Sequence, residues 1–157
     1  MPGVALDIVP VRPEDAGELL TLQRAAFVTE AQLYGDPRLP ALVETLPELL
    51  AAVSGGPALV ARTGSRVVGS VRARAAAGVL QVGRLVVAPD QQGRGIGAAL
   101  LAAVERAAGP HVHTAALFTG HRSAGNLRLY ARAGYAEQRR EAVDAQLTLV
   151  HLSKNLR

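Results

Sequence analysis

The residues of this 157-residue chain whose types and spacing could do chemistry are gathered in a glycine-rich stretch, Gln92 to Ala98. An apolar, partly β-branched run at 85–88 precedes it and suits a buried strand, and an Ala/Leu-rich run at 98–108 follows and favours a helix. A strand, a glycine-rich turn and a helix aim free backbone N–H groups and the positive helix end at an anion. Because glycines let a phosphate approach the backbone, the stretch is predicted to bind one.

Three known phosphate loops can be compared with this stretch. A Walker P-loop requires Gly-Lys-Ser/Thr, and neither a lysine nor a hydroxyl is present. A dinucleotide-binding turn is formally met by Gly93, Gly95 and Ala98, but the strand expected at 112–119 has no acidic residue for the ribose. The third pattern, Q/R-x-x-G-x-G/A, is matched by 92–97. Through it the chain resembles the GCN5-related N-acetyltransferases (GNAT), in which this loop holds the pyrophosphate of acyl-CoA. A ligand-free connection would not need an arginine between glycines.

A second stretch strengthens the resemblance. Ser123 to Tyr135, SAGNLRLYARAGY, is similar to the second GNAT signature, N-x-x-L-Y-x-x-x-G-F/Y, and one expected strand separates it from the first motif. Residues 151–156 resemble the last strand that is common in the family. The resemblance runs from Leu6 to the end and is weakest between 30 and 54.

The resemblance implies acetyl-CoA as the acyl donor, without a metal. The backbone of 85–87 would pair with the pantetheine arm like an added strand, and the N–H of Val87 would face the thioester oxygen. The loop would hold the pyrophosphate, and two polar residues would contact the CoA arm. The implied binding residues are Leu85, Val86, Val87, Gln92, Gly93, Arg94, Gly95, Ile96, Gly97, Ala98, Ser123 and Asn126.

By the same resemblance, Tyr130 matches the general acid that protonates the departing thiolate. A phenol pKa of about 10 is a reasonable match for a thiol of about 8.5. The alternative is that Tyr130 is a helix tyrosine whose ring packs against the core and whose hydroxyl contacts water.

The general base departs from the family pattern. Several members place a glutamate on the strand before or after the loop, where this chain has Gln81, Gly83 and Arg84, and then Leu117 and Phe118. The amine could arrive already neutral, or a side chain could act through water. The candidates are Glu30, Asp36, Glu44 and His121.

The acceptor pocket of the family is usually shaped by the loop between the first two helices and by the last hairpin, here 30–40 and 142–145. Arg84, with Arg72 or Arg74 on the neighbouring strand, could line it without a nearby strand carboxylate. We therefore expect an acceptor amine that carries a carboxylate, as an amino acid does. The alternative is that these arginines lie on an outer, solvated face.

Composition excludes several function classes. Lys+Arg number 17 and Asp+Glu 13, but no basic run is interleaved with aromatics, so nucleic-acid binding is not indicated. There is no cysteine, no signal-like start and no stretch apolar enough to span a bilayer. The four histidines, at 111, 113, 121 and 151, lack metal-ligand spacing. We expect a single cytoplasmic domain, 1–157, without a membrane partner. The sequence is also compatible with a homodimer.

The expected elements define an α/β fold: a mixed, mostly antiparallel central sheet flanked by helices in the order βααβββαβαββ, as in the GNAT family. Pro47 is expected to kink or restart the second helix, Ser123 to cap the last one, and Gly134 to end it in the left-handed conformation. Strands are expected at 6–11, 58–62, 66–75, 79–88, 111–119, 135–141 and 145–153, and helices from 13 to about 30, and at 40–53, 98–108 and 125–132.

The expected function is acyl-CoA-dependent N-acyl transfer, from acetyl-CoA to a primary amine by direct attack. A catalytically silent CoA-binding or partner-binding domain is the alternative from another class, and the absent strand glutamate favours it. A nucleotide oxidoreductase is a second enzymatic alternative.

Overall fold

The computed structural model describes residues 5–157 and contains one seven-stranded sheet with the order β1-β2-β3-β4-β5-β7-β6. Neighbouring strands are antiparallel except β4 and β5, which are parallel. The predicted fold class is confirmed. The strands are β1 (Leu6–Pro10), β2 (Ala58–Thr63), β3 (Arg66–Ala76), β4 (Val79–Val87), β5 (Thr114–Gly120), β6 (Ala136–Ala142) and β7 (Thr148–Asn155).

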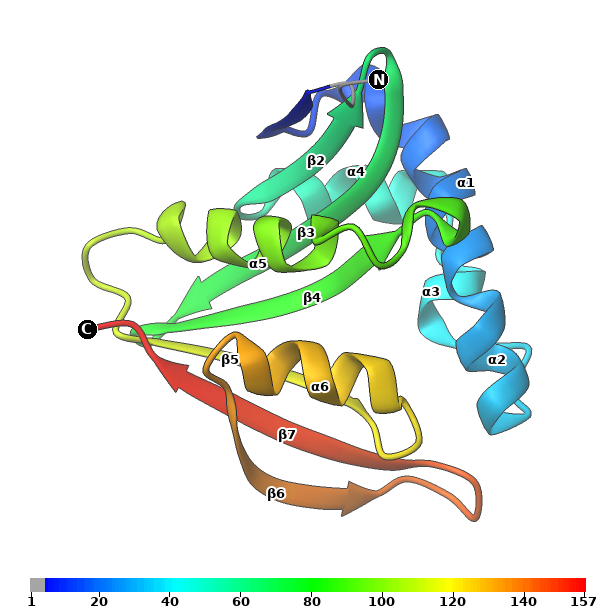
Figure 1. Ribbon diagram of the computed structural model, residues 1–157, viewed down its shortest axis with the longest axis vertical. Helices are drawn as coiled ribbons and strands as arrows, with labels where there is room; N and C mark the ends of the chain where they lie inside the picture. The colour runs from blue at the N-terminus through cyan, green and yellow to red at the C-terminus, as the bar shows by residue number, and fades with distance from the viewer. Residues whose placement is uncertain (1–4) are drawn as a thin grey trace.

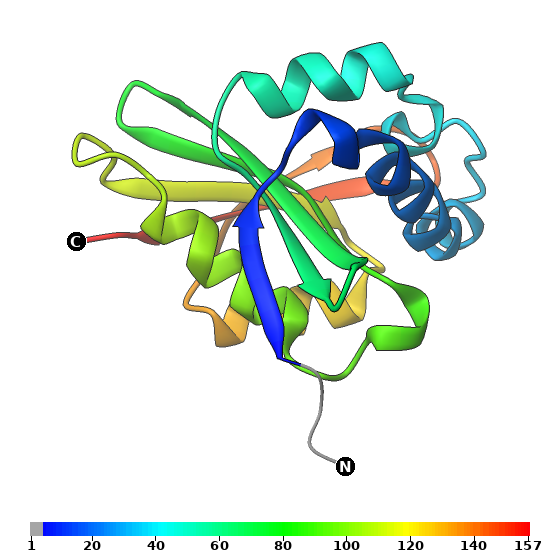
Figure 2. The same ribbon diagram turned by 90° about the horizontal axis from the view of Figure 1, so that it is seen from above.

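Helices cover both faces of the sheet (Figure 2). One layer holds α1 and α4, and the other holds α5 and α6. The helices are α1 (Ala16–Ala26), α2 (Val28–Tyr34), α3 (Pro40–Val43), α4 (Leu46–Ser54), α5 (Ile96–Arg106) and α6 (Ala124–Arg132), and the short 3-10 helices are η1 (Pro13–Asp15) and η2 (Pro89–Gln91). Within residues 5–157, none of these helices combines the length and apolarity needed to cross a bilayer.

The segment between β1 and β2 holds four helices where the sequence predicts two. The first expected helix is divided at Phe27, and the second restarts at Thr45. The Thr45 hydroxyl accepts from the backbone N–H of Glu48, whose carboxylate accepts from the N–H of Thr45 at 2.9 Å. This capping box begins α4, and Pro47 then sits in the first turn, where its missing N–H costs nothing. The predicted restart is therefore confirmed.

Two aliphatic clusters hold the layers together. Leu100, Leu101 and Val104 of α5 are fully buried against one face of the sheet. Leu49 of α4 packs on the other face in the cluster that includes Val86. Each such side chain contributes about 1.5–3 kcal/mol on burial. Leu85 and Val87 pack against the α5 cluster, and Val86 packs on the opposite face, so the end of β4 is held by contacts on both faces of the sheet.

The strands β4 and β5 pair only where they begin, at 79–81 and 114–116. Beyond those residues the two strands diverge, as Figure 1 shows. β4 also contains an irregularity at Arg84, whose φ of 50° is left-handed and which lies where the register with β3 shifts. The sheet is thus open at its centre, beside the last residues of β4.

Candidate active site

A cavity of about 880 Å³ lies at this opening, within the size range of small-molecule and cofactor sites. Its wall combines the end of β4, the glycine-rich loop, the start of α6 and residues of α1 and α2. Of the predicted binding residues, Arg94 alone does not line it. Those that do are Leu85, Val86, Val87, Gln92, Gly93, Gly95, Ile96, Gly97, Ala98, Ser123 and Asn126.

The free edge of β4 faces this cavity. The N–H of Ala88 donates to the carbonyl of Val68 on β3 at 2.8 Å. Successive N–H groups of a strand alternate in direction, so the N–H of Val87 points to the opposite edge, where β5 has moved away. An extended ligand could pair there as a strand would. The chain's geometry fits the pantetheine arm that the family resemblance implies.

The glycine-rich loop turns directly into α5. Gly95 caps the helix with a φ of +81°, a conformation that side chains rarely adopt, and a Cβ there would meet no atom within 4 Å. The first N–H groups of the helix are thereby left without intrahelical partners beside the cavity. Arg94 is exposed, and its guanidinium donates to the Gln91 side chain at 3.3 Å. The loop fits a pyrophosphate without needing that arginine in the wall.

Replacing Gly95 by alanine is expected to weaken CoA binding about tenfold. The left-handed conformation costs a residue with a Cβ roughly 1–2 kcal/mol, and the loop relieves that strain by turning its N–H groups away from the ligand. Calorimetric titration with CoA measures the change. The matched control is Gly125→Ala, because Gly125 also lines the cavity but lies within α6, where a Cβ has room. Equal affinities for the two variants would contradict the role of the loop conformation.

Tyr130 lies behind the cavity wall. It shares a face of α6 with Asn126 and Ala133, which line the cavity, but only 6% of Tyr130 is exposed. Its ring packs near that of Tyr135, with centroids 6.1 Å apart. Burial, and secondarily the negative charge of Glu30, raises the pKa of Tyr130 to about 12. The hydroxyl is therefore a weaker acid than the free phenol assumed from the sequence, and it holds its proton throughout the neutral range.

Ser123 occupies the N-cap position of α6 as predicted, but its side chain forms no capping hydrogen bond. Its hydroxyl donates to the Glu30 carboxylate at 2.6 Å and lies 2.7 Å from the Tyr34 hydroxyl. Tyr34 also accepts from the backbone N–H of Arg122 at 3.0 Å. A Cβ at Gly120 would fall 2.0 Å from the Tyr34 hydroxyl, so this approach requires glycine. The tertiary contacts compete successfully with the local cap, and they hold Glu30 at the cavity.

Sequence reasoning missed Tyr34, because nothing local marks it except the turn that follows at Gly35. Asn126, by contrast, lies where it is expected. Its amide nitrogen donates to the Thr119 hydroxyl at 3.2 Å. That bond holds the amide in one orientation at the cavity wall.

The four candidate general bases differ in whether they line the cavity. Glu30 lines the cavity, whereas Asp36, Glu44 and His121 do not. Asp36 accepts from the backbone N–H of Arg38 at 2.9 Å. The Nδ1 of His121 accepts from the N–H of Thr148 at 3.0 Å. Within residues 5–157, no cluster of three or more histidine and carboxylate groups could hold a metal ion.

Comparisons with known proteins agree with this geometry. The model of the acetyltransferase (GNAT) domain family matches residues 46–156. The structure of yncA from Salmonella typhimurium with its cofactor acetyl-CoA has a TM-score of 0.79 at 19% identity, covering 98% of this chain and 95% of that one. The PaiA N-acetyltransferase of Thermoplasma acidophilum in complex with CoA gives 0.80 at 17% identity, covering 96% and 99%. The ribosomal-protein-S18-alanine N-acetyltransferase of Escherichia coli gives 0.77 at 14% identity, covering 97% and 94%. No curated protein sequence matches.

A seven-stranded sheet opened between β4 and β5, with a glycine-rich loop beneath the opening, is the framework of an acyl-CoA-dependent transferase. The family match extends over most of the chain, and the chain belongs to the GNAT acetyltransferase domain family.

Proposed function

We propose that this protein transfers the acetyl group of acetyl-CoA directly to a primary amine. The observation that carries the proposal is the cavity itself, which joins the unpaired edge of β4 to the N-terminus of α5 and reaches Glu30. One wall suits the pantetheine arm and pyrophosphate of CoA. The other wall, from α1 and α2, leaves room for the acceptor on the far side of the sheet.

The chain's own groups supply the remaining chemistry. When acetyl-CoA is bound, its thioester supplies an activated acyl group: the amine nitrogen forms a C–N bond to the carbonyl carbon and the C–S bond breaks. The N–H of Val87 stabilises the negative charge that develops on the carbonyl oxygen. Glu30 takes the proton that the amine loses, directly or through water, and Tyr130, behind the wall beside Asn126 and Ala133, donates its hydroxyl proton to sulfur through water. The proton on Glu30 then returns through solvent to the Tyr130 phenolate, which restores both groups. The products are an amide and free CoA.

The acetyl transfer is tested by following thiol release from acetyl-CoA against a panel of primary amines. Turnover of an amine with stoichiometric amide formation supports the proposal. A protein that binds CoA but releases no thiol with any amine would instead be a silent CoA-binding domain. The absence of a carboxylate from 81–87 of β4 and from β5 favours that second candidate.

A further inference from the structure

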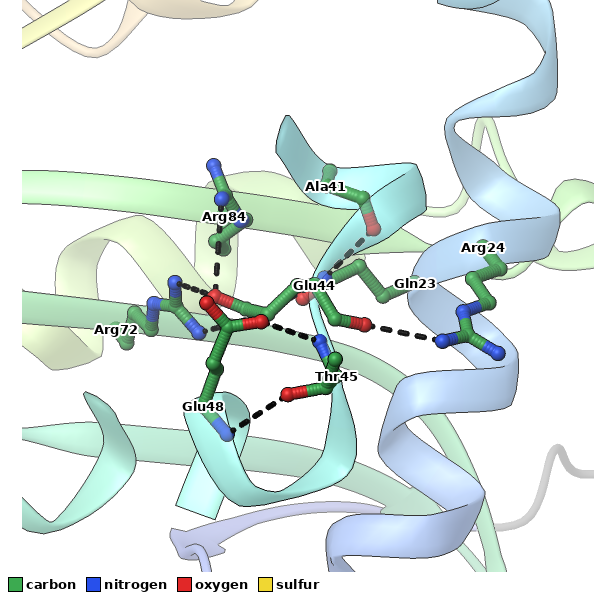
Figure 3. Close-up of polar contacts among 8 residues, drawn as sticks. All are labelled: Gln23, Arg24, Ala41, Glu44, Thr45, Glu48, Arg72 and Arg84. Carbon is green, nitrogen blue, oxygen red and sulfur yellow. Dashed lines mark hydrogen bonds and ion pairs between the residues drawn. The ribbon is translucent and has the colours of Figure 1, made fainter. Parts of the chain in front are cut away.

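The strongest unassigned feature is a half-buried ionic cluster beside the opening of the sheet. Glu44, between α3 and α4, accepts a bidentate pair of bonds from Arg72 of β3 at 2.7 and 3.0 Å. It also accepts from the Gln23 side chain of α1 at 3.1 Å, and Arg84 of β4 lies 3.7 Å away (Figure 3). The three charged side chains are 10%, 18% and 26% exposed for Glu44, Arg72 and Arg84. They are not on an outer, solvated face.

The cluster carries one positive charge too many. Two guanidinium groups share one carboxylate, and Arg72 and Gln23 already form three hydrogen bonds to the Glu44 carboxylate. Although burial alone would raise the pKa of Glu44, hydrogen bonds from these two partners lower it, so Glu44 stays ionised. Burial lowers the pKa of Arg84, and repulsion from Arg72 adds to this. An arginine does not lose its proton in a protein, so Arg84 remains a charged group without an adequate counterion.

The hydrogen-bond donors of Arg84 are also unused. Its side chain forms no hydrogen bond with the described residues, and its buried Nε has no partner among them. The backbone of Arg84 is held at a φ of 50°, in the left-handed region that an arginine rarely occupies. An incompletely compensated charge and a strained backbone at one residue are both unfavourable for stability. Within the cluster, Glu44 at 3.7 Å offsets the charge only in part.

None of the cluster's side chains lines the cavity, but two elements of the cluster continue directly into its wall. On β4, Arg84 directly precedes 85–87, which line the cavity, and on α1 the contacts of 23–24 with Glu44 lie one turn before Ala26 and Phe27, which also line it. A Cβ at Gly83 would meet no atom within 4 Å, so there is open space next to Arg84. The cluster lies on the face of the sheet opposite α5 and its CoA loop. An acceptor must approach the thioester from this opposite face.

We propose that Arg84 binds the carboxylate of the acceptor, so that the acceptor is a small amine bearing a carboxylate, as an α-amino acid is. The proposal rests on the proposed acetyl transfer. A carboxylate neutralises the single excess charge and accepts two bonds from the guanidinium fork, whereas a phosphate would bring nearly two negative charges. Glu44, 3.7 Å from the Arg84 guanidinium and itself held by Arg72, acts as the positioning residue. The amino group, a short distance from the carboxylate, is then presented to the opening between β4 and β5.

The test compares acceptors on the wild-type protein first. Each L-amino acid is assayed by thiol release against its carboxamide and its decarboxylated amine. The expected result is a KM for the best amino acid at least tenfold lower than for either analogue. Equal KM values would overturn the proposal, because the carboxylate would then contribute nothing.

Variants of Arg84 then test whether the preference for a carboxylate depends on this side chain. Arg84→Gln is expected to reduce the preference for the amino acid over its carboxamide to a ratio near one. The change should appear in the KM of the amino acid and not in the KM of acetyl-CoA, and Arg84→Lys should retain part of the preference. Arg84→Gly removes the side chain and accepts the left-handed backbone without strain, so it folds. The matched control is Ala77→Gly, in the turn after β3, at the second left-handed non-glycine position among residues 5–157, and it should leave the preference intact. An unchanged preference in Arg84→Gly overturns the proposal.

Failure of the acetyl transfer itself would be distinguishable. If no amine releases thiol, the CoA complex is titrated calorimetrically with the same amino acids. Binding that Arg84→Gln weakens at least tenfold would support the carboxylate site in a silent protein. No binding, or binding that this substitution leaves unchanged, would overturn it.

Discussion

Replacing Tyr130 by phenylalanine is expected to lower kcat by a factor on the order of 100 to 10,000, the usual value of one positioned general acid. The substitution removes a single buried oxygen and keeps the ring in its contact with Tyr135. The KM for acetyl-CoA should hardly change, because that substrate is held by the loop and by β4. Steady-state thiol release over a range of acetyl-CoA concentrations measures both constants.

The pH dependence follows from the raised pKa. With burial holding the pKa of Tyr130 at about 12, the protonated, donating form is present below that pH, and kcat should not decline on the alkaline side through this group until then. Because full transfer of a proton from such a phenol to a thiolate of about 8.5 is uphill, the hydroxyl acts while the C–S bond is still breaking.

The matched control for Tyr130 is Tyr135→Phe. Tyr135 donates to the Glu105 carboxylate at 2.7 Å, and its loss is expected to cost about 1–3 kcal/mol of unfolding free energy without a comparable change in kcat. A Tyr130→Phe protein that turns over within twofold of wild type would show that another group protonates the thiolate.

The sequence predicts those parts of the site that depend on neighbours in the chain. The loop at 92–98 follows from glycine spacing between a strand and a helix, and Gly134 has the expected positive φ of 98° at the end of α6. Such features are determined by backbone sterics over a few residues, so a local pattern is sufficient to predict them.

Contacts between distant segments are not visible in such patterns. Ser123 looks like a helix cap, but Glu30 and Tyr34, about 90 positions earlier, take its hydroxyl instead. Glu44 looks like a free carboxylate that could act as a base, and the fold turns it into the acceptor of Arg72. In both cases the residue type is correct and its partner is decided by packing, in the segment where the family resemblance is weakest.

Replacing Glu30 by glutamine is expected to lower kcat about 100-fold at neutral pH, because the ammonium group of the acceptor then has no base to receive its proton. The amide oxygen of glutamine can still accept from the Ser123 hydroxyl, so the contact that holds this segment at the cavity is retained. Asp36→Asn is the matched control, since Asp36 follows the same helix but does not line the cavity.

The decisive measurement for Glu30 is the pH profile of the variant. As the pH approaches the pKa of the acceptor's own amine, about 8 for a peptide's α-amino terminus, higher for a free amino acid and about 10.4 for an alkylamine, the neutral nucleophile forms without help. The loss in Glu30→Gln should therefore shrink with rising pH, and the recovery should move to higher pH when the acceptor's amine is more basic. A loss that stayed constant at every pH would mean that Glu30 only orders α2 through Ser123. A variant as active as wild type would remove Glu30 from the mechanism and leave the acceptor to arrive already neutral.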